Sequence, residues 1–222
     1  MTLDAVRRGP ATGKAEQLVV LLHGVGADGQ DLIDLAVPWT RGLPQAAYLA
    51  PHAPFPYDGA PYGRQWFSIS DRTPAVLLAG ARRAAAPLLA TVDAELALLG
   101  LRPEAVAFAG FSQGAMMALN AGLGRRPAPR AVLAYSGAWL PPDEVSSTPP
   151  PVLLAHGERD EVVPWQRSLE AERALRALGV AVETLWRPGL GHAIDDAGLA
   201  TGGLFLQRAF LEAAAGSPVT RA

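Results

Sequence analysis

The fold is decided by one stretch of sequence, Ala105-Val106-Ala107-Phe108-Ala109-Gly110-Phe111-Ser112-Gln113-Gly114, which runs directly into Ala115-Met116-Met117-Ala118-Leu119-Asn120-Ala121. The first five residues form an apolar run typical of a buried strand, and the last part is typical of a helix, expected from about Gln113 to Leu123. Gly110 and Gly114 stand two residues either side of Ser112 and let neighbouring backbone approach without meeting a Cβ. This G-x-S-x-G pattern predicts a sharp strand-to-helix turn with Ser112 at its tip.

Strands and helices alternate along the rest of the chain. The other expected strands are Leu18–Leu22, Ala46–Ala50, Ala131–Tyr135, Val152–Ala155 and Val180–Trp186, and the other expected helices are Asp31–Trp39, Pro74–Leu99, Pro164–Leu178 and Leu204–Ala215. Pro87 is expected to kink or break the longest helix, and Pro51 to Arg64 is expected to be a long loop without regular structure. We predict an α/β fold, a doubly wound and mostly parallel sheet with helices on both faces, in a single compact domain over residues 1–222 without a large lid.

The composition excludes several classes of protein. The chain has 222 residues, of which 50% are hydrophobic and 18% charged, so it can bury a sizeable core. Its net charge of −2 comes from scattered charges, which argues against nucleic-acid binding. Because it has no cysteine, disulfides, thiolate zinc sites, Fe–S clusters and a cysteine nucleophile are excluded. The N-terminal residues contain no apolar segment for a signal peptide, so we expect a cytoplasmic protein without stable membrane insertion.

The residues that follow the strands are the candidates for chemistry, because ligands bind at the carboxyl ends of parallel strands. A serine hydroxyl needs a base to activate it and a carboxylate to orient that base. Of the four histidines, we select His192 as the base because it lies in a glycine-rich loop after the last expected strand. His23, His52 and His156 adjoin earlier strands and come in the wrong order along the chain.

Asp160 is the best candidate for the carboxylate. It follows a predicted strand and precedes a predicted helix, which places it in a loop at the carboxyl edge of the sheet. Glu158 and Glu161 are interpreted as solvated loop charges, and Asp195 and Asp196 lie too close to the base along the chain to reach under its ring. The three groups then occur in the order Ser, Asp, His.

Acyl transfer also needs hydrogen-bond donors for the negative charge that develops on the substrate oxygen. The backbone N–H of Gln113, at the start of a helix, is one candidate because the helix dipole favours negative charge there. The N–H of Val25, between Gly24 and Gly26, is the second. An ordinary glycine turn at Val25 is the alternative.

Seven motifs run in order across nearly the whole chain: LLHGVGADGQDL (Leu21–Leu32), PHAP (Pro51–Pro54), RQWFS (Arg64–Ser68), GFSQGAMM (Gly110–Met117), YSG (Tyr135–Gly137), LLAHGERDEVVP (Leu153–Pro164) and GLGHAI (Gly189–Ile194). Together they resemble those of the bacterial carboxylesterase, phospholipase and acyl-protein thioesterase family of α/β-hydrolases. The resemblance implies the roles just assigned to Ser112, Asp160, His192, Val25 and Gln113. It also implies a serine carboxylesterase acting on short- to medium-chain acyl esters through an acyl-enzyme, with acyl thioesterase or lysophospholipase activity as the alternative.

The acyl-binding groove is predicted less directly. Five of the 15 aromatic residues lie between Phe55 and Phe67, where they form either a small core beneath the loop or the wall of an apolar ligand site. The residues predicted to contact substrate are Trp66, Phe67, Trp139, Leu140 and Val163. Ser136 is interpreted as a turn hydroxyl with a hydrogen-bond partner rather than a second nucleophile. Many family members have an acidic residue where this chain has Ser68, which implies a branch of small-ester hydrolases rather than of eukaryotic depalmitoylating enzymes.

Two other interpretations stay open. A metal hydrolase would need distant histidines to converge, because no histidine pair has the spacing of metal ligands. A non-catalytic binding protein could use the same fold, since fold does not fix function. We expect an enzyme with no cofactor and no metal, whose partner is a small-molecule acyl ester, and we allow for a homodimer.

Overall fold

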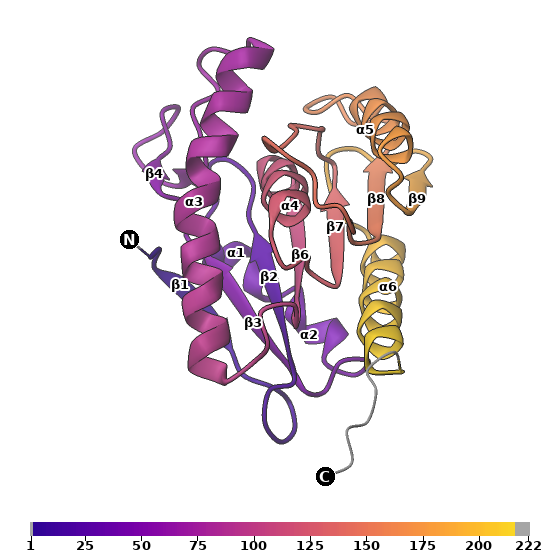
Figure 1. Cartoon of the computed structure of the whole chain (residues 1–222). Helices are drawn as coiled ribbons and strands as arrows, with labels where there is room; N and C mark the ends of the chain where they lie inside the picture. Colours follow the sequence, from indigo (N-terminus) through magenta and orange to yellow (C-terminus); the bar gives the residue numbers. More distant parts are fainter. Residues whose placement is uncertain (1, 216–222) are drawn as a thin grey trace.

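The computed structural model describes residues 2–215 (Figure 1). These residues form a seven-stranded sheet with helices packed on it, and a separate, small two-stranded sheet. The strands are β1 (Ala5–Arg8), β2 (Gln17–Leu22), β3 (Ala46–Pro51), β4 (Phe55–Pro56), β5 (Arg64–Gln65), β6 (Val106–Phe111), β7 (Ala131–Tyr135), β8 (Val152–Gly157) and β9 (Val182–Arg187). The helices are α1 (Gly29–Ile33), α2 (Ala36–Trp39), α3 (Pro74–Leu99), α4 (Gln113–Gly124), α5 (Gln166–Ala177) and α6 (Asp196–Ala215).

The large sheet is parallel except at one edge. Its strand order is β1-β3-β2-β6-β7-β8-β9, and every pair from β3 to β9 is parallel, whereas β1 runs antiparallel to β3. The predicted mostly parallel sheet is therefore confirmed. Because the parallel strands share one direction, their carboxyl ends meet at a single edge of the sheet, where the motifs identified from the sequence come together.

Helices cover both faces of this sheet, as predicted. In β2, Leu18, Val20 and Leu22 belong to a hydrophobic cluster with residues of α3, α4 and α5. The alternate residues Val19 and Leu21 belong to a second cluster with residues of α1, α2 and α6. A strand buried on both faces needs apolar residues at every position, which explains why the strands appear in the sequence as continuous apolar runs.

The strand β1 was not predicted. Half of its residues are exposed, so its sequence has no apolar run that would indicate a strand. Long-range contacts hold this strand and the residues before it: β1 pairs with β3, and Arg7 Nε donates to the buried Glu95 at 2.8 Å. Just before β1, the N–H of Leu3 donates to Thr91 Oγ1 at 2.8 Å. Its polar side chains are typical of a sheet edge, where they discourage pairing with another chain.

Three other boundaries differ from the prediction. The expected helix Asp31–Trp39 is two helices, α1 and α2, and Pro38 lies in the second, where it has no N–H to continue the hydrogen bonding of the first. The loop Pro51–Arg64 contains β4 and the start of β5, so the prediction of no regular structure there is wrong. Helix α6 begins well before the predicted start because Asp195 accepts a hydrogen bond from the N–H of Gly198 at 2.8 Å.

We expected Pro87 to kink or break helix α3, and the structure excludes the break, because α3 runs unbroken from Pro74 to Leu99. It is long and apolar enough to cross a membrane by length and composition, but it lies along the sheet, with its N-terminal end projecting beyond it (Figure 1). Its buried residues recur every three or four positions, from Gly80 through Ala84, Leu88 and Val92 to Leu96. This spacing is that of a helix packed on a core by one face.

Candidate active site

Ser112 lies at the tip of a strained turn between β6 and α4. Its φ is 56° and its ψ is −119°, a combination that a residue with a side chain rarely adopts and that the surrounding structure must hold. The two flanking glycines make this possible: a Cβ on Gly114 would lie 1.9 Å from the carbonyl oxygen of Leu22, and one on Gly110 would lie 2.2 Å from that of Gly114. The predicted strand, turn and helix are thus confirmed.

Asp160 and His192 are joined by a short hydrogen bond. His192 Nδ1 lies 2.7 Å from Asp160 Oδ2, and the carboxylate is buried while the imidazole is partly accessible. The other carboxylate oxygen accepts the backbone N–H groups of Val162 and Val163, each at 2.9 Å. A proton on Nδ1 of His192 is therefore the arrangement that this contact favours, which leaves Nε2 as the basic nitrogen.

The electrostatics keep Asp160 ionised. Burial is the largest single influence on the pKa of Asp160 and acts to raise it. The hydrogen bonds from His192 and from the N–H groups of Val163 and Val162 favour the charged form and outweigh burial, so the pKa lies below the ordinary value for aspartate. A carboxylate that is charged at neutral pH can orient the imidazole and stabilise its protonated form.

The loops that carry these two residues are hydrogen-bonded to each other. The N–H of Arg159 donates to the carbonyl of Leu190 at 2.9 Å, and the N–H of Glu158 donates to that of Arg187 at 3.0 Å. Gly157 permits the approach, because a Cβ there would lie 2.3 Å from the carbonyl oxygen of Leu190. The rival carboxylates are placed as predicted, since the side chains of Glu158 and Glu161 are exposed.

His192 lies over Phe111, the residue that precedes Ser112. Its ring is 4.7 Å from the ring of Phe111, measured between centroids. Among residues 2–215, neither Ser112 Oγ nor His192 Nε2 makes a hydrogen bond, so the two atoms are not bonded to each other in this state. Such contacts are often long in the absence of substrate and tighten in the complex.

Two backbone amides point to an oxyanion site. Val25 and Gln113 line the same cavity as Ser112, and neither N–H has an acceptor within the described part of the chain. Gly24 brings the Val25 loop against Ser112, because a Cβ on Gly24 would lie 3.4 Å from Ser112 Cβ. The side chain of His23 holds this loop: Nδ1 donates to the carbonyl of Gly24 at 2.7 Å, and Nε2 accepts the N–H of Ala53 at 3.0 Å.

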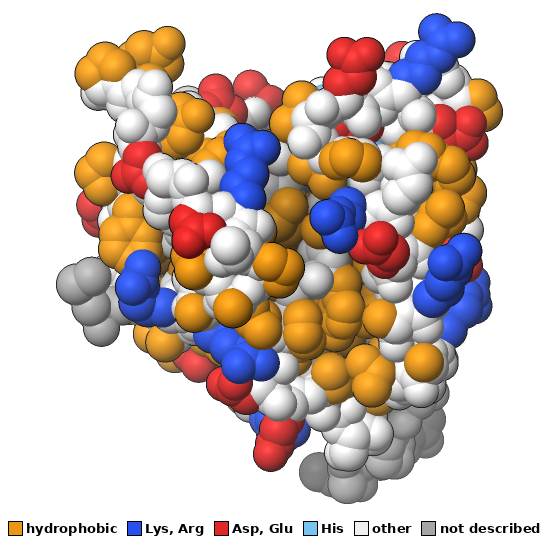
Figure 2. Space-filling model, turned by 90° about the horizontal axis from the view of Figure 1, so that it is seen from above, with side chains coloured by type: hydrophobic (Ala, Val, Ile, Leu, Met, Phe, Trp, Pro, Cys, Tyr) orange, Lys and Arg blue, Asp and Glu red, His pale blue; other side chains and the backbone are white. Residues whose placement is uncertain are grey.

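A cavity of about 510 Å³ opens beside Ser112 and is lined mainly by apolar side chains. Seen from above, the molecule has a hollow near its middle bounded mostly by hydrophobic side chains, with charged side chains around it (Figure 2). Of the residues predicted to contact substrate, the structure places Phe67, Trp139, Leu140 and Val163 in its lining. The sequence did not single out Ile69, Leu77, Met116 and Val162, which also line it, because only the tertiary structure brings them to the same wall.

Trp66 lies elsewhere than predicted. Its side chain is fully buried and does not line the cavity, because its indole N–H donates to the carbonyl of His23 at 2.9 Å. The side chain of Gln113 ties the same segment to α4, accepting the N–H of Trp66 at 2.8 Å and donating to the carbonyl of Phe67 at 2.8 Å. Trp66 thus belongs to the support beneath the site.

The interpretation of Ser136 is also corrected. Its hydroxyl is buried and has no hydrogen-bond partner within residues 2–215, whereas a satisfied turn hydroxyl was expected. Its backbone N–H donates to the carbonyl of Ala155 at 2.9 Å, and its φ of 50° is again unusual for a residue with a side chain. The hydroxyl of Ser136 is not among the groups that line the Ser112 cavity.

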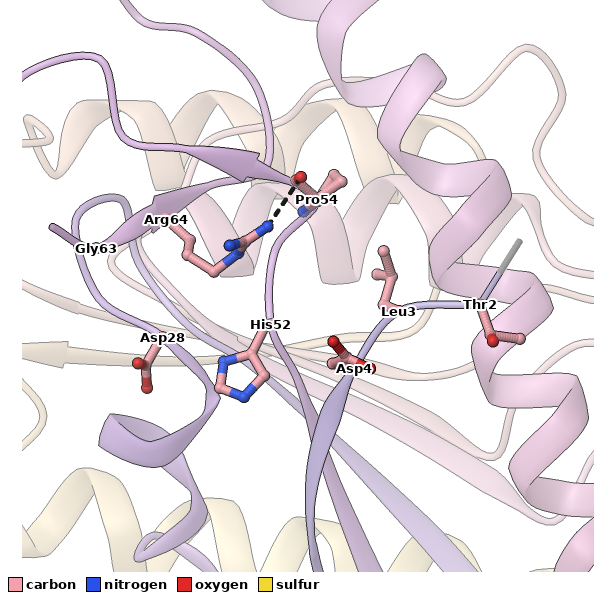
Figure 3. Close-up of a pocket in the computed structure, with 8 residues that line it drawn as sticks. All are labelled: Thr2, Leu3, Asp4, Asp28, His52, Pro54, Gly63 and Arg64. Carbon is pink, nitrogen blue, oxygen red and sulfur yellow. Dashed lines mark hydrogen bonds between the residues drawn. The ribbon is translucent and has the colours of Figure 1, made fainter. Parts of the chain in front are cut away.

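A second cavity, of about 600 Å³, is lined by Thr2, Leu3, Asp4, Asp28, His52, Pro54, Gly63 and Arg64 (Figure 3). Most of its ionisable groups hold the surrounding backbone. Arg64 donates to the carbonyls of Ala53 and Pro54, His52 Nδ1 accepts the N–H of Gly29 at 3.2 Å, and Asp28 accepts the N–H of Gln30 at 2.7 Å. In the described part of the chain, no group of three or more His, Asp or Glu side chains is arranged to hold a metal ion.

Comparisons with known proteins identify the family of this chain. Residues 9–209 match the model of the phospholipase/carboxylesterase family. The chain is 31% identical to esterase YpfH of Escherichia coli strain K12 over 182 residues, which cover 82% of this chain and 78% of that protein. It is 28% identical to acyl-protein thioesterase 1 of Gibberella zeae, with 83% and 86% of the two chains covered.

Solved structures show the same likeness. The crystal structure of esterase PE8 superposes with a TM-score of 0.87 at 40% identity, covering 94% of this chain and 99% of the other. The fold is therefore that of the α/β-hydrolases, and the protein is a hydrolase of the carboxylesterase and thioesterase kind. This chain belongs to the phospholipase/carboxylesterase family.

Proposed function

We propose that this protein is a serine carboxylesterase that hydrolyses short- to medium-chain acyl esters through an acyl-enzyme. The observation that carries the proposal is the hydrogen bond between Asp160 and His192 at the carboxyl edge of the sheet. Ser112 lies at the same edge, on its strained turn. The two amides of Val25 and Gln113, which have no acceptor within residues 2–215, complete the set of groups that acyl transfer requires.

The proposed cycle assigns one role to each group. Nε2 of His192 takes the proton of Ser112 as Oγ attacks the ester carbonyl, and the N–H groups of Val25 and Gln113 stabilise the oxyanion. The imidazolium then protonates the oxygen of the leaving group as the C–O bond breaks, which releases the alcohol and leaves the acyl group on Oγ. His192 next removes a proton from water as the water oxygen attacks the acyl carbonyl. The imidazolium then returns this proton to Oγ as the bond between the acyl carbon and Oγ breaks, which releases the carboxylic acid and restores Ser112.

The shape and polarity of the cavity support an apolar acyl group. At about 510 Å³, it has room for a small ligand, and the side chains of Leu140, Trp139 and Met116 offer it an apolar wall. A thioester is a second candidate substrate, because one matched relative is named an acyl-protein thioesterase and oxygen and sulfur esters share the same tetrahedral chemistry.

The test compares Ser112→Ala with Ser136→Ala on p-nitrophenyl acetate. We expect Ser112→Ala to lose on the order of a thousandfold or more in kcat while Ser136→Ala stays near wild type. A fluorophosphonate probe should label wild-type protein and Ser136→Ala but not Ser112→Ala. A correctly folded Ser112→Ala with unchanged turnover, or a wild-type protein that the probe does not label, would remove the proposal.

The substrate class is then measured with a series of p-nitrophenyl esters and acyl thioesters of increasing chain length. The ratio of kcat/KM values identifies the preferred leaving group and chain. The proposed cycle uses no metal, so we expect exhaustive dialysis against EDTA to leave turnover unchanged. A complete loss that zinc restores would favour a metal hydrolase instead.

A further inference from the structure

A second imidazole contacts the carboxylate of Asp160. His156 lies near the end of β8, and its side chain is fully buried. Its Nε2 lies 3.1 Å from Asp160 Oδ2 and 2.8 Å from the carbonyl oxygen of Val163. The proposed cycle gives this buried histidine no role, although it shares an oxygen of Asp160 with His192.

The surroundings of His156 select one protonation state. Both partners of Nε2 are acceptors, so Nε2 carries a proton. Nδ1 lies 2.6 Å from the hydroxyl oxygen of Ser168 in α5, which can supply the donor that a deprotonated ring nitrogen requires. Burial lowers the pKa of His156, against the opposing effect of Asp160, so the ring is neutral at pH 7. Asp160 and His192 are the ionisable groups that act on it.

The consequence for Asp160 is a carboxylate fixed on both oxygens. Oδ1 accepts hydrogen bonds from the backbone N–H groups of Val162 and Val163. Oδ2 accepts hydrogen bonds from Nε2 of His156 and from Nδ1 of His192. Removing the His156 donor would leave Oδ2 held only by the imidazole that it has to orient. The N–H of His156 also withdraws charge from the same oxygen that faces His192.

We propose that His156 is a positioning residue for acyl transfer: its Nε2–H fixes Oδ2 of Asp160 in the place from which that oxygen orients His192. The hydroxyl of Ser168 adds a further hydrogen bond to this series and holds His156 in one tautomer. The proposal rests on the proposed function, because orientation of His192 matters only if His192 activates Ser112.

The test compares four variants with wild type: His156→Phe, which removes the donor, His156→Gln, whose amide can donate to the same oxygen, Ser168→Ala, which frees Nδ1, and His52→Gln as the matched control at the end of β3. For each variant we would measure kcat and KM on p-nitrophenyl acetate, the pH midpoint of the acid limb of kcat/KM, the rate of fluorophosphonate labelling and the melting temperature. The control replaces a histidine whose side chain accepts a hydrogen bond from a backbone N–H near another strand end.

For His156→Phe we expect kcat to fall about tenfold to a hundredfold at nearly unchanged KM, because a small misplacement of a catalytic group is costly. The acid limb should move to higher pH, because Oδ2 then shares its charge with one donor instead of two. His156→Gln should recover most of kcat, Ser168→Ala should show a smaller shift in the same direction, and His52→Gln should match wild type.

A folded His156→Phe with unchanged kcat and acid limb would overturn the proposal, as would a His156→Gln that loses as much kcat as His156→Phe. If His156→Phe does not fold, the decision falls to His156→Gln and Ser168→Ala, and a Ser168→Ala with wild-type kcat and acid limb then counts against it. Failure of wild-type protein to react with the fluorophosphonate would instead remove the proposed function, so the two failures are distinguishable.

Discussion

The two cavities at the carboxyl edge of the sheet differ in what their polar groups do. The Ser112 cavity is largely apolar, and within residues 2–215 the hydroxyl of Ser112 and the N–H groups of Val25 and Gln113 make no hydrogen bond. The other cavity carries more ionisable side chains, but Arg64, His52 and Asp28 are hydrogen-bonded to backbone atoms that they hold in place. In this molecule, polar groups that lack a hydrogen-bond partner identify the candidate site better than the number of ionisable side chains around a cavity.

The largest expected effect concerns Asp160, the buried carboxylate that is hydrogen-bonded to His192. Asp160→Asn should lower kcat on the order of ten-thousandfold, because an amide no longer stabilises the protonated imidazole and favours the wrong tautomer of His192. The matched change Asp4→Asn, in the second cavity, should leave kcat within about twofold. Steady-state kinetics on p-nitrophenyl acetate measures kcat for both variants. Comparable losses of kcat would contradict the assignment of catalysis to the Ser112 site rather than to the second cavity.

A smaller effect should separate long from short substrates. Trp139→Ala removes a large part of the apolar wall, so kcat/KM for an octanoyl ester should fall about tenfold to a hundredfold, while the acetyl ester changes much less. Leu98→Ala, at an exposed apolar position of α3, is the control and should affect neither ester. Equal losses on both esters would mean that Trp139 supports the fold rather than binds the chain.

Stability should fall as the pH is lowered, because burial lowers the pKa values of His23 and His156. Below the ordinary histidine pKa of 6.5, the unfolded chain binds protons that the folded protein does not, so the free energy of unfolding decreases until the folded pKa values are passed. The limiting slope is about 1.4 kcal/mol per pH unit for each histidine. Asp160, whose pKa is lowered, adds a further loss only below its ordinary value of 3.8.

Urea unfolding between pH 7.5 and 5 measures this slope. In His156→Gln only one of the two buried histidines is left, so the slope should be about half that of wild type. A slope that the substitution leaves unchanged would contradict the assignment of a neutral, buried His156.

The smallest effect belongs to the second cavity. Asp28 caps α1, with its side chain accepting the N–H of Gln30 and its own N–H donating to Asp31, so Asp28→Ala should cost about 1 kcal/mol of unfolding free energy. Asp4→Ala, whose exposed side chain caps no helix, should cost less than half as much. A large loss of kcat in Asp28→Ala without a loss of stability would give the second cavity a role in turnover. The functional difference between the two cavities would then be contradicted.

The elements nearest the candidate site were the ones best predicted from sequence. The apolar runs of β6, β7 and β8 and the glycines around Ser112 are local signals, and the structure has each of these elements within a few residues of the prediction. Asp160 and His192 could be selected because the strand order limits which loops meet. The edge strand β1 was not predicted, because its own residues form no apolar run and its partners, β3 and Glu95, lie far along the chain.

Sequence by itself determined the order of strands and helices, the turn that carries Ser112 and the short list of side chains at the strand ends, because hydrophobic periodicity and glycine act over a few residues. Only the tertiary structure decided that Asp160 is shared by two histidines, that Trp66 lies beneath the site while Phe67 lines it, and that Ser136 has no partner in the described chain. Those outcomes depend on contacts between residues far apart along the chain, such as the hydrogen bond between Gln113 and Trp66. Such contacts form when the sheet and its covering helices pack together, and no local pattern encodes them.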